Sequence, residues 1–81
     1  MKTFHLTVAR IGENLFDEEV VSVSLPGIEG TFQILAGHEP FVSLLTAGTV
    51  HIKNANGQAH SFKTPKEGVA EISYSQATVL L

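Results

Sequence analysis

GIEGTFQILAGHEP, which spans residues 27–40, contains a predicted turn, a short predicted strand and a second predicted turn. Gly27 and Gly30 stand at the two ends of the first predicted turn. Glycine suits a turn because it adopts positive φ angles without steric cost. Phe32 and Ile34 alternate with polar neighbours, so one side of the strand is apolar. Compact irregular segments cost conformational freedom, and such loops often carry function. We therefore expect function to concentrate in this stretch and ordinary β-sheet to form the rest.

Alternating apolar and polar residues predict β-strands on both sides of this stretch. The pattern is clearest in residues 3–11, 20–25 and 49–54. Turn signals separate the predicted strands every eight to twelve residues or so, which is typical of an all-β domain. The sequence therefore predicts one domain over residues 1–81, a two-sheet antiparallel β-sandwich of about 8–10 short strands.

Local signals predict where the strands end. Residues 17–19, Asp-Glu-Glu, are expected to form a charged corner. Pro26 is expected to end the strand before it, because proline cannot donate to a ladder. The Asn-Gly pair at residues 56–57 indicates a hairpin. A two-residue loop would turn Phe62 to the polar face, whereas a three-residue loop pairs Val50 with Phe62, so the apolar pattern favours the longer loop.

The composition excludes several classes of function. The 81 residues carry a formal net charge of −3, 43% are hydrophobic, and none is cysteine. A net-acidic small domain is a poor candidate for binding nucleic acid or anionic lipid surfaces. Without cysteine there is no disulfide and no thiolate metal site, which fits a reducing compartment. No apolar run approaches the roughly 20 residues of a membrane span, and the N-terminus lacks a signal-peptide pattern.

No residue pattern indicates an enzyme. The four histidines lack the spacing of a metal site, and the carboxylates at 17–19 look solvated rather than arranged as an acid–base pair. The Gly27-x-x-Gly30 pattern is not followed by the helix that a phosphate loop needs. The sequence also contains no Gly-x-Ser-x-Gly motif. We therefore expect no catalytic residue, no metal and no cofactor.

Two other functions stay open on the residues alone. Lys66 lies on a predicted turn between Pro65 and Glu67, as does the modified lysine of small lipoyl or biotinyl carrier domains. Those families place that lysine in Asp-Lys-Ala or Met-Lys-Met, from which Pro-Lys-Glu departs. A small-molecule-binding β-domain would instead need a concave pocket with converging polar groups.

Several segments together resemble the N-terminal β-sandwich of the epsilon subunit of F-type ATP synthases. The segments are Gly27-Ile-Glu-Gly30, Ile34-Leu-Ala-Gly37-His38-Glu-Pro40, Ala47-Gly48-Thr-Val-His-Ile52 and Gly68-Val69-Ala70-Glu71-Ile72. The family pattern runs approximately Gly-x-x-Gly, then Ile-Leu-Pro-Gly-His-x-Pro, then Gly-Val-x-x-Ile. The resemblance covers essentially the whole chain. Gln33, Ala36 and Glu67 depart from the pattern, and these departures concern loop details rather than the fold.

The resemblance implies a mechanical role without catalysis. The family's sandwich sits at the foot of the central stalk, where it holds the gamma subunit to the c-subunit ring and helps transmit ion-driven rotation for ATP synthesis. It also implies a peripheral position on the cytoplasmic side of the inner membrane in a bacterial-type complex. Family members usually continue into a helical hairpin that inhibits ATP hydrolysis. This sequence stops at Leu81, so we expect the chain alone to lack that regulation.

The resemblance also suggests, residue by residue, where partners bind. The turn that resembles the family's ring-facing loop holds the c-ring candidates Ile28, Glu29 and Thr31. The positions that resemble those lying against gamma are Arg10, His38 and Ser43. Thr31 is uncharged where relatives can carry an acid, which argues against an electrostatic account of the ring contact.

Overall fold

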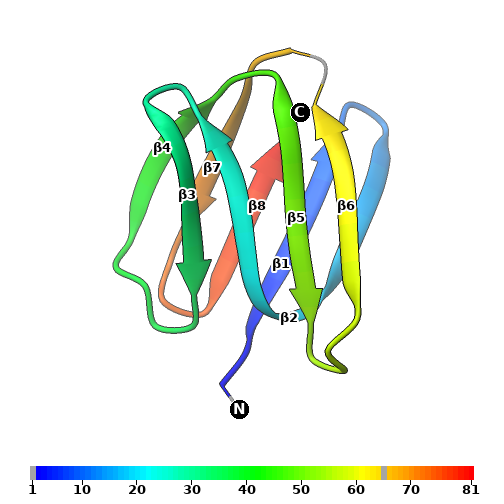
Figure 1. Cartoon of the computed structure of the whole chain (residues 1–81), viewed down its shortest axis with the longest axis vertical. Coiled ribbons are helices and arrows are strands. Elements are labelled where there is room, and N and C mark those ends of the chain that lie inside the picture. The colour runs from blue at the N-terminus through cyan, green and yellow to red at the C-terminus, as the bar shows by residue number, and fades with distance from the viewer. Residues whose placement is uncertain (1, 65) are drawn as a thin grey trace.

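The computed structural model describes residues 2–64 and 66–81, and this part of the chain consists of strands joined by turns (Figure 1). The strands are β1 (Phe4–Arg10), β2 (Glu13–Gly27), β3 (Gly30–Leu35), β4 (Phe41–Leu45), β5 (Gly48–Asn54), β6 (Ala59–Thr64), β7 (Gly68–Ile72) and β8 (Gln76–Leu80). Among the described residues there is no helix with the length and apolarity needed to cross a membrane. The predicted all-β class is confirmed.

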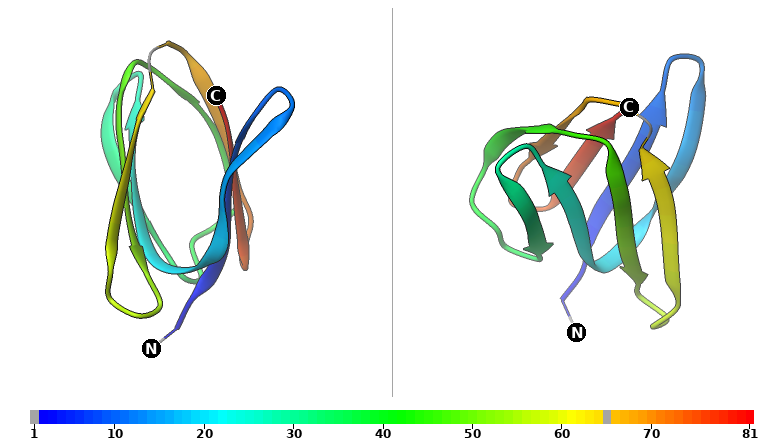
Figure 2. Two further views of the ribbon diagram at one scale, coloured as in Figure 1. Left: turned by 90° about the vertical axis from the view of Figure 1, so that its right-hand side faces the viewer. Right: turned by 45° about the horizontal axis from the view of Figure 1, so that its top comes forward.

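The strands form two facing layers that share β2 (Figure 2). Sheet I contains β3, the second half of β2, β5 and β6, in that order. Sheet II contains the first half of β2, then β1, β8, β7 and β4. All neighbouring strands are antiparallel except β1 and β8, which run parallel. The shared strand makes the sandwich one continuous hydrogen-bonded structure.

The crossing between the layers occurs at Val20. This residue pairs with Phe4 of β1 in sheet II and with Asn54 of β5 in sheet I. Its side chain is fully buried. At the opposite side of the sandwich, Gly27 at the end of β2 pairs with Leu45 of β4, so the two layers are joined there as well.

The predicted alternation places one face of each strand in the core. Residues from both sheets pack there, and the buried apolar side chains are Phe4, Leu6, Val8, Phe16, Val20, Val23, Leu25, Ile34, Leu45, Val50, Ile52, Ala70, Ile72, Ala77 and Val79. Burying a Val, Leu, Ile or Phe side chain contributes roughly 1.5–3 kcal/mol relative to leaving it exposed. The core thus provides the main stabilisation of a domain that contains no cysteine for a disulfide.

Aromatic pairs close the two open sides of the sandwich. Phe16 of β2 packs edge-on against Phe62 of β6, with ring centroids 6.0 Å apart. On the other side Phe32 of β3 meets Phe41 of β4 in the same manner at 5.7 Å. Edge-to-face aromatic pairs contribute about 0.5–1.5 kcal/mol beyond their buried area. Both pairs join a strand of sheet I to a strand of sheet II.

Two local predictions are wrong. Residues 17–19 do not form a corner but continue β2, where Asp17 pairs with Thr7 and Glu19 with His5. Pro26 does not end the strand, since it pairs with Thr31 of β3. The carbonyl of Pro26 accepts a hydrogen bond from the Thr46 amide. The backbone nitrogen and carbonyl of a strand residue point to the same side, so the Pro26 nitrogen faces Thr46 and not β3. The missing N–H therefore removes no hydrogen bond from the β2–β3 ladder.

The predicted register of the 56–57 hairpin is confirmed. Val50 pairs with Phe62, and Asn54 receives a backbone hydrogen bond from Gly57 and donates one to Gln58. Gly57 adopts a φ of 82°, so the loop is the expected three residues with a left-handed glycine. The buried Asn54 side chain also accepts hydrogen bonds from the amides of residues 56 and 58, which fixes the loop from below.

The close approach at Gly27 gives a test of the packing at the beginning of the β2–β3 turn. A Cβ added to Gly27 would lie 2.8 Å from the Gly30 carbonyl oxygen and 2.8 Å from the ring of Phe32. We expect Gly27→Ala to lower the free energy of unfolding by about 2 kcal/mol, as overpacking does. Urea unfolding measures this loss, with exposed Glu29→Ala as the control. Equal midpoints for the two variants would contradict the packing at Gly27.

Candidate partner-binding surfaces

The c-ring candidates lie together on the turn between β2 and β3. Gly27 pairs with Gly30, so Ile28 and Glu29 form the two-residue tip, and Gly30 has a φ of 130° that favours glycine. The side chain of Ile28 is 58% exposed, and Glu29 and Thr31 are exposed as well. The Ile28 amide donates to the Leu44 carbonyl at 3.2 Å, which ties the tip to β4. The turn thus presents an apolar side chain on a fixed backbone.

A groove runs between this turn and β4. It has a volume of about 510 Å³ and is lined by residues 27–32 and 42–44. Ser43, expected beside gamma, lines this groove with the c-ring candidates, and its hydroxyl donates to the Leu44 carbonyl at 3.2 Å. The structure therefore groups Ser43 with the turn rather than with the other two gamma candidates.

The remaining gamma candidates lie at opposite ends of the sandwich (Figure 1). Arg10 ends β1, at the same end as the β2–β3 turn, and its guanidinium donates twice to one carboxylate oxygen of Glu13 at 2.9 Å. His38 lies in the loop before β4, at the other end, and its ring packs against Phe41 with centroids 5.0 Å apart. The three gamma candidates are not a cluster, so a partner that touches all of them has to cover a wide surface.

An exposed apolar surface lies on the outer side of sheet II, and none of the sequence patterns predicted it. The strand register places Leu44, Val69, Leu80 and Ala9 side by side across β4, β7, β8 and β1. Leu44 and Leu80 are 56% and 52% exposed, and Val42 beside them is 65% exposed. We call these five residues the apolar face. The sequence shows that these residues alternate with core residues along their strands. Which of them become neighbours depends on the order of the strands, which local sequence patterns do not reveal.

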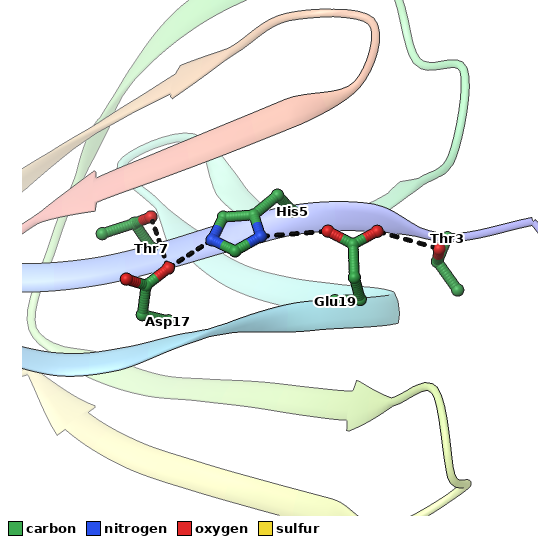
Figure 3. Close-up of polar contacts among 5 residues, drawn as sticks. All are labelled: Thr3, His5, Thr7, Asp17 and Glu19. Carbon is green, nitrogen blue, oxygen red and sulfur yellow. Dashed lines mark hydrogen bonds and ion pairs between the residues drawn. The ribbon is translucent and has the colours of Figure 1, made fainter.

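The other half of the same outer side is charged (Figure 3). His5 on β1 lies between Asp17 and Glu19 on β2, and each ring nitrogen contacts one carboxylate. The distance from Nδ1 to the Glu19 carboxylate is 2.9 Å. The Thr3 hydroxyl donates to the other carboxylate oxygen of Glu19, and the Thr7 hydroxyl donates to Asp17. A ring that donates from both nitrogens is protonated, so this arrangement favours the imidazolium.

The two carboxylates change the titration of His5. The hydrogen bond to Asp17, followed by that to Glu19, raises the pKa of His5 above its ordinary value of 6.5. All three side chains are well exposed, so water screens the interaction. No group of three or more potential ligands among residues 2–64 and 66–81 could hold a metal ion. The ion pairs of His5 with Asp17 and Glu19 make the cluster an ionic contact between β1 and β2.

The raised pKa of His5 predicts a pH dependence of stability. The folded chain holds a proton on His5 more tightly than the unfolded chain, so the stabilisation is complete below pH 6.5 and is lost as the pH rises through the folded-state pKa. We expect the wild type to be more stable than His5→Gln at pH 5.5 and the difference to shrink by pH 8.5. Urea unfolding across this range measures it, with exposed His51→Gln as the control. A constant difference would refute the ionic contact.

Comparison with known proteins gives the family. Residues 3–81 match the family model described as the ATP synthase, Delta/Epsilon chain, beta-sandwich domain. The ATP synthase epsilon chain of Nitratidesulfovibrio vulgaris strain DP4 is 38% identical over 79 residues, which cover 98% of this chain and 58% of that relative. The epsilon chain of Chlorobium limicola is 34% identical over 98% of this chain and 89% of its own length. The chain thus spans little more than half the length of several curated relatives and most of the length of the Chlorobium limicola relative.

Solved structures share the fold. A chain of the Euglena gracilis mitochondrial ATP synthase, in a structure of its OSCP, F1 and c-ring, superposes with a TM-score of 0.89 at 24% identity, over 96% of this chain and 49% of that one. A chain from the central stalk and c-ring of the Tetrahymena thermophila mitochondrial enzyme gives 0.75 at 12% identity, over 98% of this chain and 63% of that one. The β-sandwich prediction and the suspected resemblance are both confirmed. The chain belongs to the ATP synthase delta/epsilon chain family and is matched over almost all of its length by that family's β-sandwich domain.

Proposed function

We propose that this chain is a non-catalytic rotor subunit of the F-type ATP synthase. In this role it links the gamma subunit to the c-subunit ring, transmits ion-driven rotation towards ATP synthesis, and sits peripherally on the cytoplasmic side of the membrane. Family membership supports the proposal, and so do the similar chains in the Euglena gracilis assembly, which contains a c-ring, and in the Tetrahymena thermophila central stalk and c-ring. The observation that carries it is the apolar face, because a contiguous exposed apolar patch marks a protein interface.

The apolar face has the chemistry of a protein interface, but its few side chains do not supply a whole one. Leu44, Leu80 and Val42 are 52–65% exposed, so their burial under a partner contributes about half of the roughly 1.5–3 kcal/mol of a full transfer from water for each. That sum falls short of the −8 kcal/mol or so of a micromolar complex, and association has a cost of its own. The apolar face therefore serves as the centre of a larger gamma interface, to which contacts at its margin have to add.

The three gamma candidates relate to the apolar face in different ways. Arg10 follows Ala9 on β1, and His38 packs against Phe41 where β4 begins, so a partner centred on the apolar face reaches both at its margin. Ser43 lies between Val42 and Leu44 on β4, so its side chain points to the other side of the strand, into the groove beside the β2–β3 turn. We therefore assign Arg10 and His38 to the margin of the gamma interface, and a contact of gamma with Ser43 requires a partner that reaches around the edge of β4.

The c-ring contact is assigned to the tip of the β2–β3 turn. Ile28 offers an exposed apolar side chain, and Glu29 and Thr31 flank it with one charge and one hydroxyl. The backbone there is fixed by the Gly27–Gly30 pairing and by the hydrogen bond to β4. A fixed protruding turn transmits torque with little loss through bending, which suits a mechanical coupling element.

We further propose that the sandwich performs this coupling without inhibitory C-terminal helices. The Chlorobium limicola relative supports this, because the match covers 89% of its length and leaves little room beyond the sandwich. The family match over residues 3–81 supports the rotor hypothesis over the carrier hypothesis for Lys66. Pro65, on the same predicted turn, lies outside the described residues.

The gamma interface can be tested with a matched pair of leucines. Leu80 lies on the apolar face and Leu35 on β3 in sheet I, and each is 52% exposed. We expect Leu80→Asp to raise the dissociation constant for gamma at least about tenfold, or roughly 1.4 kcal/mol. Leu35→Asp should leave it unchanged. Calorimetric titration of gamma from the same source measures both. Equal effects, or no association of the wild type, would reject the proposed function.

The ring contact is tested by the complementary substitution. Ile28→Asp places a charge at the exposed tip and should weaken retention of the gamma-bound chain on purified c-ring by at least about tenfold. Its affinity for gamma should stay at the wild-type value, because the tip lies outside the apolar face. Co-sedimentation with c-ring in detergent measures the first quantity. Loss of gamma binding together with ring binding would show that the two surfaces are not separate.

A further inference from the structure

A pocket at the end of the sandwich lies apart from the apolar face and from the β2–β3 turn, although the gamma candidate Arg10 is one of its lining residues. It has a volume of about 270 Å³ and lies between the β1–β2 turn, the end of β6 and the last residue of the chain. Its lining consists of Arg10, Ile11, Leu15, Lys63, Lys66 and Leu81. Figures 1 and 2 show these segments side by side at the end that also carries the β2–β3 turn.

The floor of this pocket is apolar and well supported. Leu15 and Leu81 are partly buried and pack against the core. The Leu81 amide donates to the Ala9 carbonyl at 2.9 Å, which holds the last residue beside β1. Ile11 stands at the rim, where its side chain is fully exposed. An aliphatic group that enters the pocket would be removed from water on several sides.

The rim of the pocket is basic although the chain is acidic. The chain has five lysines and arginines in total and a net charge of −3, yet three of these cations line this one pocket. Arg10 is already paired with Glu13. Lys63 and Lys66 form no ion pair with any residue in the described ranges 2–64 and 66–81. Two unpaired ammonium groups at the mouth of an apolar pocket attract an anion.

We propose that this pocket binds a small anionic amphiphile, a carboxylate or phosphate head with a short aliphatic chain. The head lies between Lys63 and Lys66, and the aliphatic part rests on Leu15 and Leu81 with Ile11 over it. The volume is at the small end of the roughly 300–1,000 Å³ range of ligand pockets, so it takes a head group and a few methylenes. Such a head can belong to a free organic acid or to an anionic lipid.

The test separates the two parts of the ligand by using three probes on the isotopically labelled chain. Hexanoate carries both parts, acetate carries only the anion, and hexanol carries only the aliphatic chain. We expect hexanoate to give saturable amide shifts at Ile11, Leu15, Lys66 and Leu81, with a dissociation constant on the order of a few millimolar. Acetate and hexanol should bind at least about tenfold more weakly.

Matched variants test the assigned residues. The double variant Lys63→Gln/Lys66→Gln removes both ammonium groups and should weaken hexanoate binding at least about tenfold, or roughly 1.4 kcal/mol, whereas Lys53→Gln on β5 should not. Ile11→Ser should weaken it several-fold, whereas Ile28→Ser, at the other exposed turn, should not. All the substituted side chains are exposed, and the same spectra report whether each variant is folded.

Vesicle flotation identifies the source of the ligand. Binding to phosphatidylglycerol but not phosphatidylcholine vesicles, lost in the double lysine variant, would support the proposal with an anionic lipid as the ligand. Hexanoate binding without vesicle binding would support it with a free acid. The proposal is overturned if hexanoate produces no saturable shifts at the pocket, or if the double variant binds it as well as the wild type. The chain is tested alone, so the outcome does not depend on gamma or the c-ring.

Discussion

Val20 lies in both sheets at once, and the arrangement of every other strand follows from that crossing. Its pairing with Phe4 on one side and with Asn54 on the other fixes the distance and the register between the layers. Because β2 supplies an edge of sheet II and an interior strand of sheet I, the two layers cannot slide past each other without breaking its ladder. The aromatic pairs at the two open sides and the Gly27–Leu45 pairing reinforce the same constraint.

A sandwich held in this way presents separate surfaces with different chemistry. The outer side of sheet II carries the apolar face at one end of β4, β7, β8 and β1, and a charged cluster on β1 and β2, where His5 bridges Asp17 and Glu19. One end carries both the β2–β3 turn and the basic pocket. Because the two layers are fixed to each other, we expect the domain to move as a rigid body when a force acts on the β2–β3 turn. The proposed rotor role needs this property more than it needs any reactive group.

Local patterning was sufficient to predict the strands, the two-layer class and the hairpin register that pairs Val50 with Phe62. It failed at residues 17–19 and Pro26, because β2 is long enough to serve both sheets and its exposed acidic segment looks like a turn. The apolar face could not be predicted, since Leu44 and Leu80 become neighbours only through β7. The convergence of Lys63 and Lys66 on Arg10 has the same non-local origin. The six partner candidates came from the resemblance, and the structure groups Ile28, Glu29, Thr31 and Ser43 but leaves Arg10 and His38 apart.

The proposed rotor role depends above all on the apolar face of sheet II being the surface that meets gamma. Methyl resonances of the labelled chain, recorded with and without unlabelled gamma, decide this. We expect the methyl signals of Leu44, Val69 and Leu80 to shift or broaden on complex formation, while those of Leu35 on the opposite sheet keep their positions. Perturbation of Leu35 with unchanged signals from Leu44, Val69 and Leu80 would contradict it.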